Sequence, residues 1–400
     1  MLTIGKEIDK DEYVYINAAR SRVALVCGKR GSGKSYTLGV FVEELIETED
    51  VIVIIIDPMG IYHTMALPNR EQEQVLRDWG LRAREAKVKL LVPGEAEELY
   101  GGAEIISAMQ RRGVIFQALR INPSDMTPDG WCELFDLTLN EPMGIVLYRA
   151  VQELQRRMRR TGQPFSIEQM ISQVERDKRA VEKTREALLL RLEMAKDWGI
   201  FADEYQSILD FFEPKIVNVI DLSVIDPGRY GLRNLIVDVV CRDLFRKRTI
   251  DRRREELHLP TRVPKIWLAM DEAQQFIPSA KSSLSKETLI RWVKEGRQPG
   301  LSLIVASQQP AAIDGEVLSQ CDILLAHKIT ALEDVQAINK LSQDYMSSEL
   351  RNLIKRIKGS GFAVLVDDEE ELAQTIKIRP RKSKHGGGES AVGRVATFKI

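Results

Sequence analysis

Residues 28–35 read GKRGSGKS, which matches the pattern G-x-x-x-x-G-K-[ST] at every specified position. In such a loop the glycines adopt backbone conformations that a side chain would block, and successive N–H groups converge on phosphate oxygens at a helix N-terminus. The lysine bridges the terminal phosphates of a nucleotide and the serine hydroxyl holds Mg²⁺. We therefore expect Lys34 to bind phosphate and Ser35 to bind metal. The expected phosphate-binding residues are Gly28, Lys29, Arg30, Gly31, Ser32, Gly33, Lys34, Ser35 and Tyr36.

A second chemical motif, IWLAMDEAQQF, ends an apolar run with two adjacent carboxylates, Asp271 and Glu272. Hydrolysis of a nucleoside triphosphate needs a carboxylate that helps to hold Mg²⁺ and a base that orients the attacking water. A lone Asp-Glu pair is weak evidence, because such a pair is often just an exposed strand end. Together with the phosphate-binding loop, it predicts that Asp271 takes the metal and Glu272 the water.

Two further polar residues flank the apolar run LSLIVAS at 301–307. Gln308 ends that run, where a side-chain amide could sense the γ-phosphate or hold the attacking water. Arg297 lies before it in a glycine-flanked turn, EGRQPG, and could act as an arginine finger toward the nucleotide of a neighbouring subunit. The alternative for Arg297 is an ordinary surface charge.

These motifs need elements that hold them together at one edge of a sheet. Short apolar runs predict strands, and helical periodicity follows the loop in YTLGVFVEELIE. Continuously apolar strands are typical of a parallel sheet that is buried on both faces. The sequence thus predicts an α/β fold of the P-loop NTPase class, RecA-like, with a largely parallel sheet flanked by helices. The predicted strands are 23–28, 51–57, 88–92, 114–121, 216–222, 266–271, 301–307 and 321–328.

A stretch of different character, rich in charges and in helical periodicity, interrupts this alternation at residues 125–213. We expect a helical insertion subdomain there, between an N-terminal part (1–124) and a C-terminal part (214–378) of the ATPase core. A basic and then glycine-rich segment, RPRKSKHGGGES, opens a tail at 379–400.

The composition is that of an ordinary globular protein, with 400 residues of which 44% are hydrophobic and 29% charged. The longest aliphatic run, VIVIII at 51–56, is too short to cross a bilayer, and the N-terminus carries acids where a signal peptide would be apolar. We therefore expect a cytoplasmic protein without membrane contact. The four cysteines lie far apart with no C-x-x-C pair, which suggests neither a zinc site nor a disulfide framework.

The formal net charge of −1 excludes a global basic field. Contact with nucleic acid would therefore have to be local, as in a ring whose central pore gathers a few basic residues from each subunit. The loop PSAKSSLSKE, just after the second motif, carries Lys281 and Lys286, which we predict to line such a pore. A mobile surface loop is the alternative.

The series of motifs resembles the HerA branch of the HerA/FtsK superfamily, whose members are hexameric ring ATPases that pump DNA. The resemblance rests on RVALVCGKRGSGKS, IIIDPMGIY, VNVIDLS, MDEAQQF, KEGRQPGLSLIVASQQP and LSQCDILLAHK, and it covers nearly the whole chain. It implies ATP and Mg²⁺ as cofactors, and it implies that Arg297 and Arg22 are contributed to a neighbour's site. The active-site residues implied by the resemblance are Lys34, Ser35, Asp57, Asp271, Glu272 and Gln308.

The sequence departs from this family at several points. Family members usually carry a small β-barrel ahead of the ATPase, whereas the first strand predicted here begins at Val23, which puts docking of a NurA-type nuclease through that barrel in doubt. The family's D-x-x-G-E-Y reads DPMGIY with Ile61 in place of the acid, and its SQRP reads SQQP with Gln309 in place of arginine. The segment IKIRPRKSKHGGG resembles the family's C-terminal segment, which reaches over an adjacent subunit near the nucleotide; a solvated tail is the alternative.

No motif of a nuclease, protease or NADase accompanies these residues. The sequence predicts a subunit of a ring-forming ATPase, hexameric by resemblance, that translocates or unwinds double-stranded DNA. A separate nuclease or other effector would act with it in DNA processing or phage defence. Two alternatives stay open, namely a coupling ATPase of the conjugation or secretion type and a regulatory or scaffold ring that activates a partner enzyme.

Overall fold

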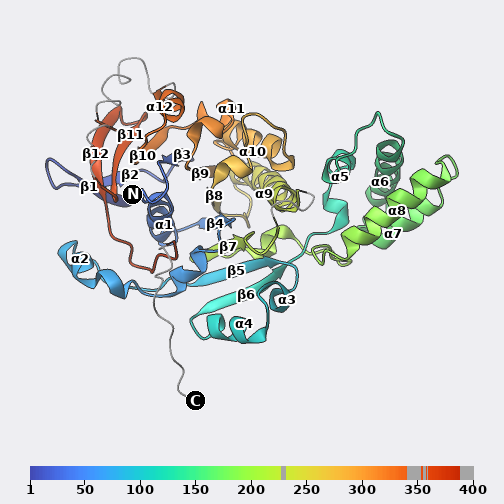
Figure 1. The fold of residues 1–400 in the computed structure, drawn as a ribbon, viewed down its shortest axis with the longest axis horizontal. Coiled ribbons are helices and arrows are strands. Elements are labelled where there is room, and N and C mark those ends of the chain that lie inside the picture. The colour runs from blue at the N-terminus through green and yellow to red at the C-terminus, as the bar shows by residue number, and fades with distance from the viewer. Residues whose placement is uncertain (227–230, 340–352, 355–356, 358, 388–400) are drawn as a thin grey trace.

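The computed structural model describes residues 1–226, 231–339, 353–354, 357 and 359–387 (Figure 1). Within them, a single 12-stranded sheet has the order β2-β1-β12-β11-β10-β3-β9-β8-β4-β7-β5-β6. The strands are β1 (Leu2–Glu7), β2 (Tyr13–Ile16), β3 (Val23–Cys27), β4 (Val51–Asp57), β5 (Val88–Pro93), β6 (Val114–Leu119), β7 (Val217–Asp221), β8 (Lys265–Met270), β9 (Leu301–Ser307), β10 (Ile323–Ala326), β11 (Phe362–Asp367) and β12 (Leu372–Ile378).

The part of the sheet from β10 to β6 is parallel throughout. It consists of the eight strands predicted from the apolar runs, so the predicted α/β fold with a largely parallel sheet is confirmed. The phosphate-loop strand β3 lies between β10 and β9, and β9 separates it from β8, the strand that ends at the Asp-Glu pair. This order brings the carboxyl ends of β3, β9 and β8 side by side.

Four strands were missing from the sequence prediction, and they extend the sheet on the β10 side in antiparallel pairings. The expectation that the first strand begins at Val23 was wrong, because Leu2–Glu7 and Tyr13–Ile16 already form β1 and β2. These strands are short and only partly buried, so they lack the continuous apolar runs that identify the parallel ones. Gly5 permits the close pairing of β1 with β12, since a Cβ there would lie 2.3 Å from the carbonyl oxygen of Lys377.

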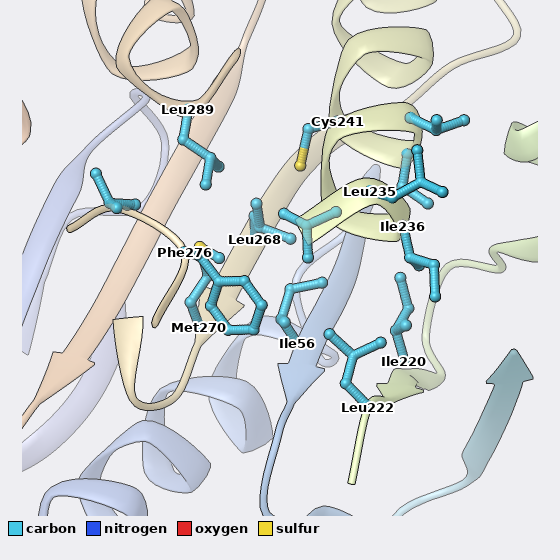
Figure 2. Packing of buried hydrophobic residues seen from close by; sticks show 14 of the residues in the cluster. Ile56, Ile220, Leu222, Leu235, Ile236, Cys241, Leu268, Met270, Phe276 and Leu289 are labelled. Atoms are coloured by element: carbon cyan, nitrogen blue, oxygen red, sulfur yellow. The ribbon is translucent and has the colours of Figure 1, made fainter. Parts of the chain in front are cut away.

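Helices cover both faces of the parallel strands. Side chains of α1 (Lys34–Leu45) pack against one face, and those of α9 (Leu232–Glu256) and α10 (Leu284–Glu295) against the other. Figure 2 shows the second face, where Leu235 and Cys241 of α9 lie over Leu268 of β8 and Ile56 of β4. Alternate residues of each central strand point to opposite faces, and burial on both explains their continuous apolar runs.

The segment predicted to be a helical insertion contains α5 (Pro128–Leu134), α6 (Pro142–Thr161), α7 (Ile167–Glu175) and α8 (Glu182–Lys196). These helices lie together at one side of the sheet (Figure 1). Trp131 of α5 stacks on Phe201 with ring centroids 5.2 Å apart. The remaining helices are α2 (Glu73–Asp78), α3 (Ala96–Leu99), α4 (Ala103–Gln110), α11 (Gly315–Leu318) and α12 (Leu332–Asn339). Short 3₁₀ turns occur at Tyr62–Ala66, Arg70–Gln72, Pro123–Asp125, Ile208–Phe211, Ala273–Gln275 and Pro310–Ala312.

The start of the predicted tail is folded against α1 of the same chain. Arg379 is buried and pairs with Glu43 at 2.8 Å and with Glu44 at 2.9 Å. The guanidinium of Arg381 packs over Gly39, where a Cβ would meet its Cζ atom at 2.5 Å. Residues 379–387 are thus an integral part of the fold rather than a solvated tail, and the rest of the predicted tail, 388–400, lies outside the described residues.

No helix in the described ranges is long and apolar enough to cross a membrane. All four cysteines, which are Cys27, Cys132, Cys241 and Cys321, carry free thiols. Burial raises the pKa of Cys132 to about 11, which keeps this thiol protonated and unreactive at neutral pH.

Candidate nucleotide-binding and hydrolysis site

The loop at residues 28–35 connects β3 directly to α1, as the motif requires. Its three glycines have φ of 153° at Gly28, 74° at Gly31 and 109° at Gly33, so each adopts the left-handed conformations predicted for them. Gly28 is also sterically required, because a Cβ there would lie 2.6 Å from Ser32 Oγ and 2.7 Å from His327 Cβ. The backbone is therefore already shaped to turn its N–H groups toward an anion at the start of α1.

Lys34 is almost completely buried and donates from Nζ to the carbonyl of Lys29 at 3.3 Å. Burial lowers the pKa of Lys34, while the carboxylates of Glu272 and Asp271 act in the opposite direction. Ser32 Oγ is also buried, and no residue in the described part of the chain offers it a hydrogen bond. A buried hydroxyl without a partner is costly, and a phosphate oxygen in the loop would satisfy it.

Asp271 follows β8 and lies next to the loop serine. It accepts hydrogen bonds from the hydroxyls of Ser35 and Tyr62, the latter at 2.9 Å, and these bonds oppose the rise in its pKa that burial causes. A carboxylate and a hydroxyl are the hard oxygen ligands that Mg²⁺ prefers, so this pair fits the ion. Tyr62 was not recognised from the sequence.

Glu272 is held between two amides. Its backbone φ is 48°, which is unusual for a residue with a side chain. One oxygen of its carboxylate accepts a hydrogen bond from Gln308 Nε2, and the other accepts one from Gln274 Nε2 at 2.7 Å. Gln274 is in turn fixed by the hydroxyl of Ser307 at 2.8 Å. The structure thus brings Gln308 and Glu272 together, because β9 ends between the loop and β8.

Asp57, at the end of β4, is fully buried, and its carboxylate accepts hydrogen bonds from backbone N–H groups. One carboxylate oxygen accepts the N–H groups of Met59 and Gly60, and the other accepts the N–H of Tyr62 at 2.9 Å. Burial raises the pKa of Asp57 to about 7, assisted by the neighbouring carboxylate of Asp221 and opposed by the N–H donors. In this structure Asp57 shapes the turn that carries Tyr62 to Asp271.

His327, another residue that the sequence analysis missed, lies directly behind the loop. Its Nδ1 is 2.8 Å from the carbonyl oxygen of Phe362, which can only accept, so Nδ1 carries the proton. Its Nε2 then accepts the hydroxyl of Thr37 at 2.9 Å. Burial lowers the pKa of His327 to about 4, so the ring is neutral and links α1 to β11.

Arg297 and Arg22 lie at the amino ends of the parallel strands, whereas the loop and the carboxylates lie at the carboxyl ends. Arg297 precedes β9, whose seven residues span roughly 20 Å, and its side chain is 72% exposed. Neither arginine can therefore reach the nucleotide site of its own chain.

Arg22 is not available as a finger in this arrangement. Its side chain is fully buried and pairs with Asp322 at 2.9 Å, Asp367 at 2.5 Å and Glu369 at 3.2 Å. Withdrawing it would leave the buried Asp367 carboxylate uncompensated, and breaking a buried ion pair costs about 3–5 kcal/mol. The contribution of Arg22 to a neighbour's site stays a prediction, and it would require this network of ion pairs to open.

The two lysines predicted to line a pore lie in the loop after β8 and at the start of α10. Lys281 is exposed. Lys286 lies in the first turns of α10, where its Nζ pairs with Asp314 at 2.8 Å and donates to the carbonyl of Lys281 at 3.2 Å. The charge of Lys286 is thus balanced within its own chain, which leaves Lys281 as the better candidate for contact with phosphates.

A cavity of about 370 Å³ adjoins the phosphate loop on the β11 side. The loop and α1 contribute Gly31, Gly33 and Tyr36 to its wall, and the folded tail contributes Pro380 and His385. Its position beside the start of α1 suits the sugar and base of a nucleotide whose phosphates occupy the loop.

The fold and the site define a P-loop ATPase. The family model described as "Helicase HerA, central domain" matches residues 2–244. The chain therefore belongs to the HerA helicase family, as the motif series indicated, and it is an ATPase of the helicase type.

Curated relatives match along most of the chain. The DNA double-strand break repair helicase HerA of Pyrococcus furiosus is 23% identical over 393 residues, which cover 93% of this chain and 67% of the relative. The protein of the same name from Sulfolobus acidocaldarius is 24% identical and covers 96% and 70%, respectively.

Solved structures share the fold. VirB4 of Thermoanaerobacter pseudethanolicus superposes with a TM-score of 0.61 at 16% identity, covering 94% of this chain and 96% of that one. The plasmid coupling protein TrwB in complex with ADP and Mg²⁺ gives a TM-score of 0.54 at 13% identity, covering 91% and 86%.

Proposed function

We propose that the chain is the motor subunit of a ring-forming, ATP-hydrolysing translocase of double-stranded DNA. One observation carries the proposal. The groups that we expect to bind and cleave phosphate gather at the carboxyl ends of the strands, while Arg297, the exposed arginine suited to complete such a site, lies at the opposite end of β9. A complete site would then require a second copy of the chain, and repeating that contact closes a ring.

Within each site, the backbone of the loop and Lys34 would hold the β- and γ-phosphates of ATP. Ser35 and Asp271 would hold Mg²⁺, which supplies positive charge to the phosphates when bound. Glu272, fixed by Gln308 and Gln274, would orient the attacking water and accept its proton. Tyr36 and the adjoining cavity would receive the nucleoside.

The substrate follows from the family rather than from the net charge. The relatives carry the name of a DNA double-strand break repair helicase, and a hexamer of subunits with a formal charge of −1 could still concentrate Lys281 from each subunit around one pore. Hydrolysis alone has no use in such a machine, so we propose that a separate nuclease or other effector acts on the DNA that the ring moves, in DNA processing or in phage defence.

The decisive experiment measures the ATPase rate with and without linear double-stranded DNA, together with the native mass of the assembly. We expect a mass that is a multiple of 45.4 kDa and a rate that rises with DNA. The Lys34→Ala protein is the matched control and should show no hydrolysis in either condition.

Two outcomes of this experiment would contradict the proposal. A fully active monomer would contradict the ring, because Arg297 could then not complete any site. An active ring whose ATPase rate is the same with and without DNA would favour a regulatory ring that activates a partner enzyme over a translocase.

A further inference from the structure

Residues 367–371, which form the end of β11 and the turn into β12, read DDEEE and lie at the edge of the sheet that carries Arg22 and Arg297. The turn reaches that edge because β11 runs antiparallel to β10, with Asp367 paired to Ile323 at the amino end of β10. The turn is far from the phosphate loop, and none of its carboxylates belongs to the site described above.

Glu369 in this turn joins the two arginines. Its Oε2 lies 3.2 Å from Nη1 of Arg22, and its Oε1 lies 3.2 Å from Nη2 of Arg297. The side chain of Glu369 is 23% exposed, and its backbone N–H donates to Asp367 Oδ1 at 3.1 Å. A single carboxylate, fixed through both its backbone and one oxygen, thus bridges a buried guanidinium and an exposed one.

The two arginines differ in their freedom. Arg22 is also held by Asp322 and Asp367, so it cannot follow a movement of Arg297. The contact of Arg297 with Glu369 uses Nη2, and a guanidinium has five N–H donors, so Arg297 can stay on Glu369 and still offer donors to a phosphate. An exposed arginine would otherwise sample many rotamers, and one anchored nitrogen restricts it.

We propose that Glu369 is a positioning residue that holds Arg297 toward the nucleotide of the neighbouring subunit, with Arg22 as its anchor. This inference rests on the proposed function, in which Arg297 completes the neighbour's site. In this proposal Arg22 is not a second finger. Arg22 holds the carboxylate of Glu369 in place, and Glu369 holds Arg297.

The test compares the steady-state kinetics of Glu369→Gln, Glu369→Asp and Glu370→Gln rings with those of wild type. Glutamine removes the charge, and aspartate keeps the charge beside Arg22 while being too short to bridge both arginines. Both Glu369 variants should lower kcat about three- to fivefold at nearly unchanged KM, which is the effect expected for one partly exposed ion pair. Glu370, exposed in the same turn, is the matched control and should leave kcat unchanged.

A mixing experiment separates positioning from a structural defect. Glu369 lies in the subunit that supplies Arg297, so adding Lys34→Ala subunits to Glu369→Gln subunits should raise the rate per intact loop toward the wild-type value. In the double variant Arg297→Ala/Glu369→Gln, the second change should add no further loss to the first. A wild-type kcat for both Glu369 variants, a further loss in the double variant, or no recovery on mixing would overturn the inference.

The Arg297→Ala ring, measured in parallel, keeps the two proposals apart. If it hydrolyses ATP at the wild-type rate, the proposed shared site fails. If it is slow while both Glu369 variants, folded and assembled, are as fast as wild type, only the role of Glu369 is refuted.

Discussion

Arg297 and Gln308 flank the same strand at opposite ends. Gln308 follows β9 and donates to Glu272 inside the candidate site, whereas Arg297 precedes β9 and lies roughly 20 Å away at the other edge of the sheet. One buried strand therefore connects an amide inside the candidate site with a guanidinium that faces outward. Movement of β9 on hydrolysis in one site would displace the arginine offered to the next.

The first prediction uses this arrangement in mixed rings. Arg297→Ala subunits should hydrolyse ATP very slowly, because an arginine finger is worth about 10³ to 10⁵ in rate. Adding Lys34→Ala subunits should restore part of the activity, since an intact loop can then meet an intact finger. The measurement is the ATPase rate as a function of the mixing ratio, with subunit exchange followed by native mass spectrometry.

The matched control for that prediction is a mixture of Gln308→Ala with Lys34→Ala. Both changes damage the loop side of a site, so every site in the mixture lacks one group or the other, and no activity should return. If the Arg297→Ala mixture also stays inactive while mixed rings form, Arg297 does not complete the neighbouring site, and its loss acts only through the structure of its own subunit.

The second prediction separates binding from turnover. Glu272→Gln keeps the side-chain size and leaves the Asp271 carboxylate for the metal, so this protein should retain nucleotide but hydrolyse it at least 10²-fold more slowly. Lys34→Ala should lose hydrolysis by removing the phosphate clamp. Fluorescent nucleotide binding and phosphate release give the two readouts, and near-normal turnover by Glu272→Gln would show that another group orients the water.

The third prediction concerns the two lysines after β8. Lys281→Ala should weaken binding to double-stranded DNA and flatten its dependence on salt, because a contact with phosphate is lost. Lys286→Ala should have the smaller effect, since Lys286 is already paired with Asp314. Fluorescence anisotropy at several salt concentrations measures both, and equal salt dependence in wild type and the Lys281 variant would place the DNA track elsewhere.

The fourth prediction is a dependence of stability on pH. The pKa of His327 is about 4 in the folded protein and about 6.5 when unfolded, so the unfolded state binds the proton first. The contribution of neutral His327 to the free energy of unfolding is fully present above pH 6.5. It is lost progressively as the pH falls from 6.5 toward 4, and the loss is about 2 kcal/mol at pH 5.

The measurement for His327 is urea denaturation at pH 7 and pH 5. The His327→Gln protein removes the titrating group, so its stability should fall less than that of wild type over this interval. An equal fall in both proteins would mean that His327 is not the group that titrates.

The fifth prediction tests the folded start of the tail. Arg379→Ala leaves the buried carboxylate of Glu43 without its closest guanidinium, and breaking a buried pair costs about 3–5 kcal/mol. Glu43 keeps hydrogen bonds from residues 382–383, so we expect the lower end of that range. The midpoint of urea unfolding measures the change.

The control is Lys384→Ala, which breaks an exposed pair with Glu71 and should cost less than 1 kcal/mol. A loss for Arg379→Ala as small as that for Lys384→Ala would mean that the tail contributes little to the stability of the fold.

The sequence predicted the parts of the site that depend on local pattern. The glycines of the loop and the apolar runs before Asp57, Asp271 and Gln308 are local signals, because a phosphate loop and a buried parallel strand each need particular residue types in a row. These signals identify the central strands, the position of the loop and the residues that follow them.

The contacts that complete the site could not be predicted, because they join distant parts of the chain without a motif. Tyr62 meets Asp271 across 209 positions, and Thr37 meets His327 across 290. Arg22 stands at the position of a finger, but the carboxylates that enclose it lie 300 or more residues later. Of the antiparallel strands, β1, β2 and β12 lack a continuous buried run, whereas β11 is buried along most of its length and was missed although its residues FAVLVD are largely apolar. The division into domains remains a prediction.

The pairing of the tail with α1 also has a consequence for the order of synthesis. Glu43 leaves the ribosome 336 residues before Arg379, its buried partner. At a translation rate of about 5 to 20 residues per second, Arg379 is synthesised roughly 20 to 70 s after Glu43 of α1. During this time a nascent chain has the complete GKRGSGKS sequence but not the contacts that seat α1 and line the adjoining cavity. Only a chain translated past Arg379 can acquire these contacts, so products truncated before that residue would not compete with longer chains for ATP.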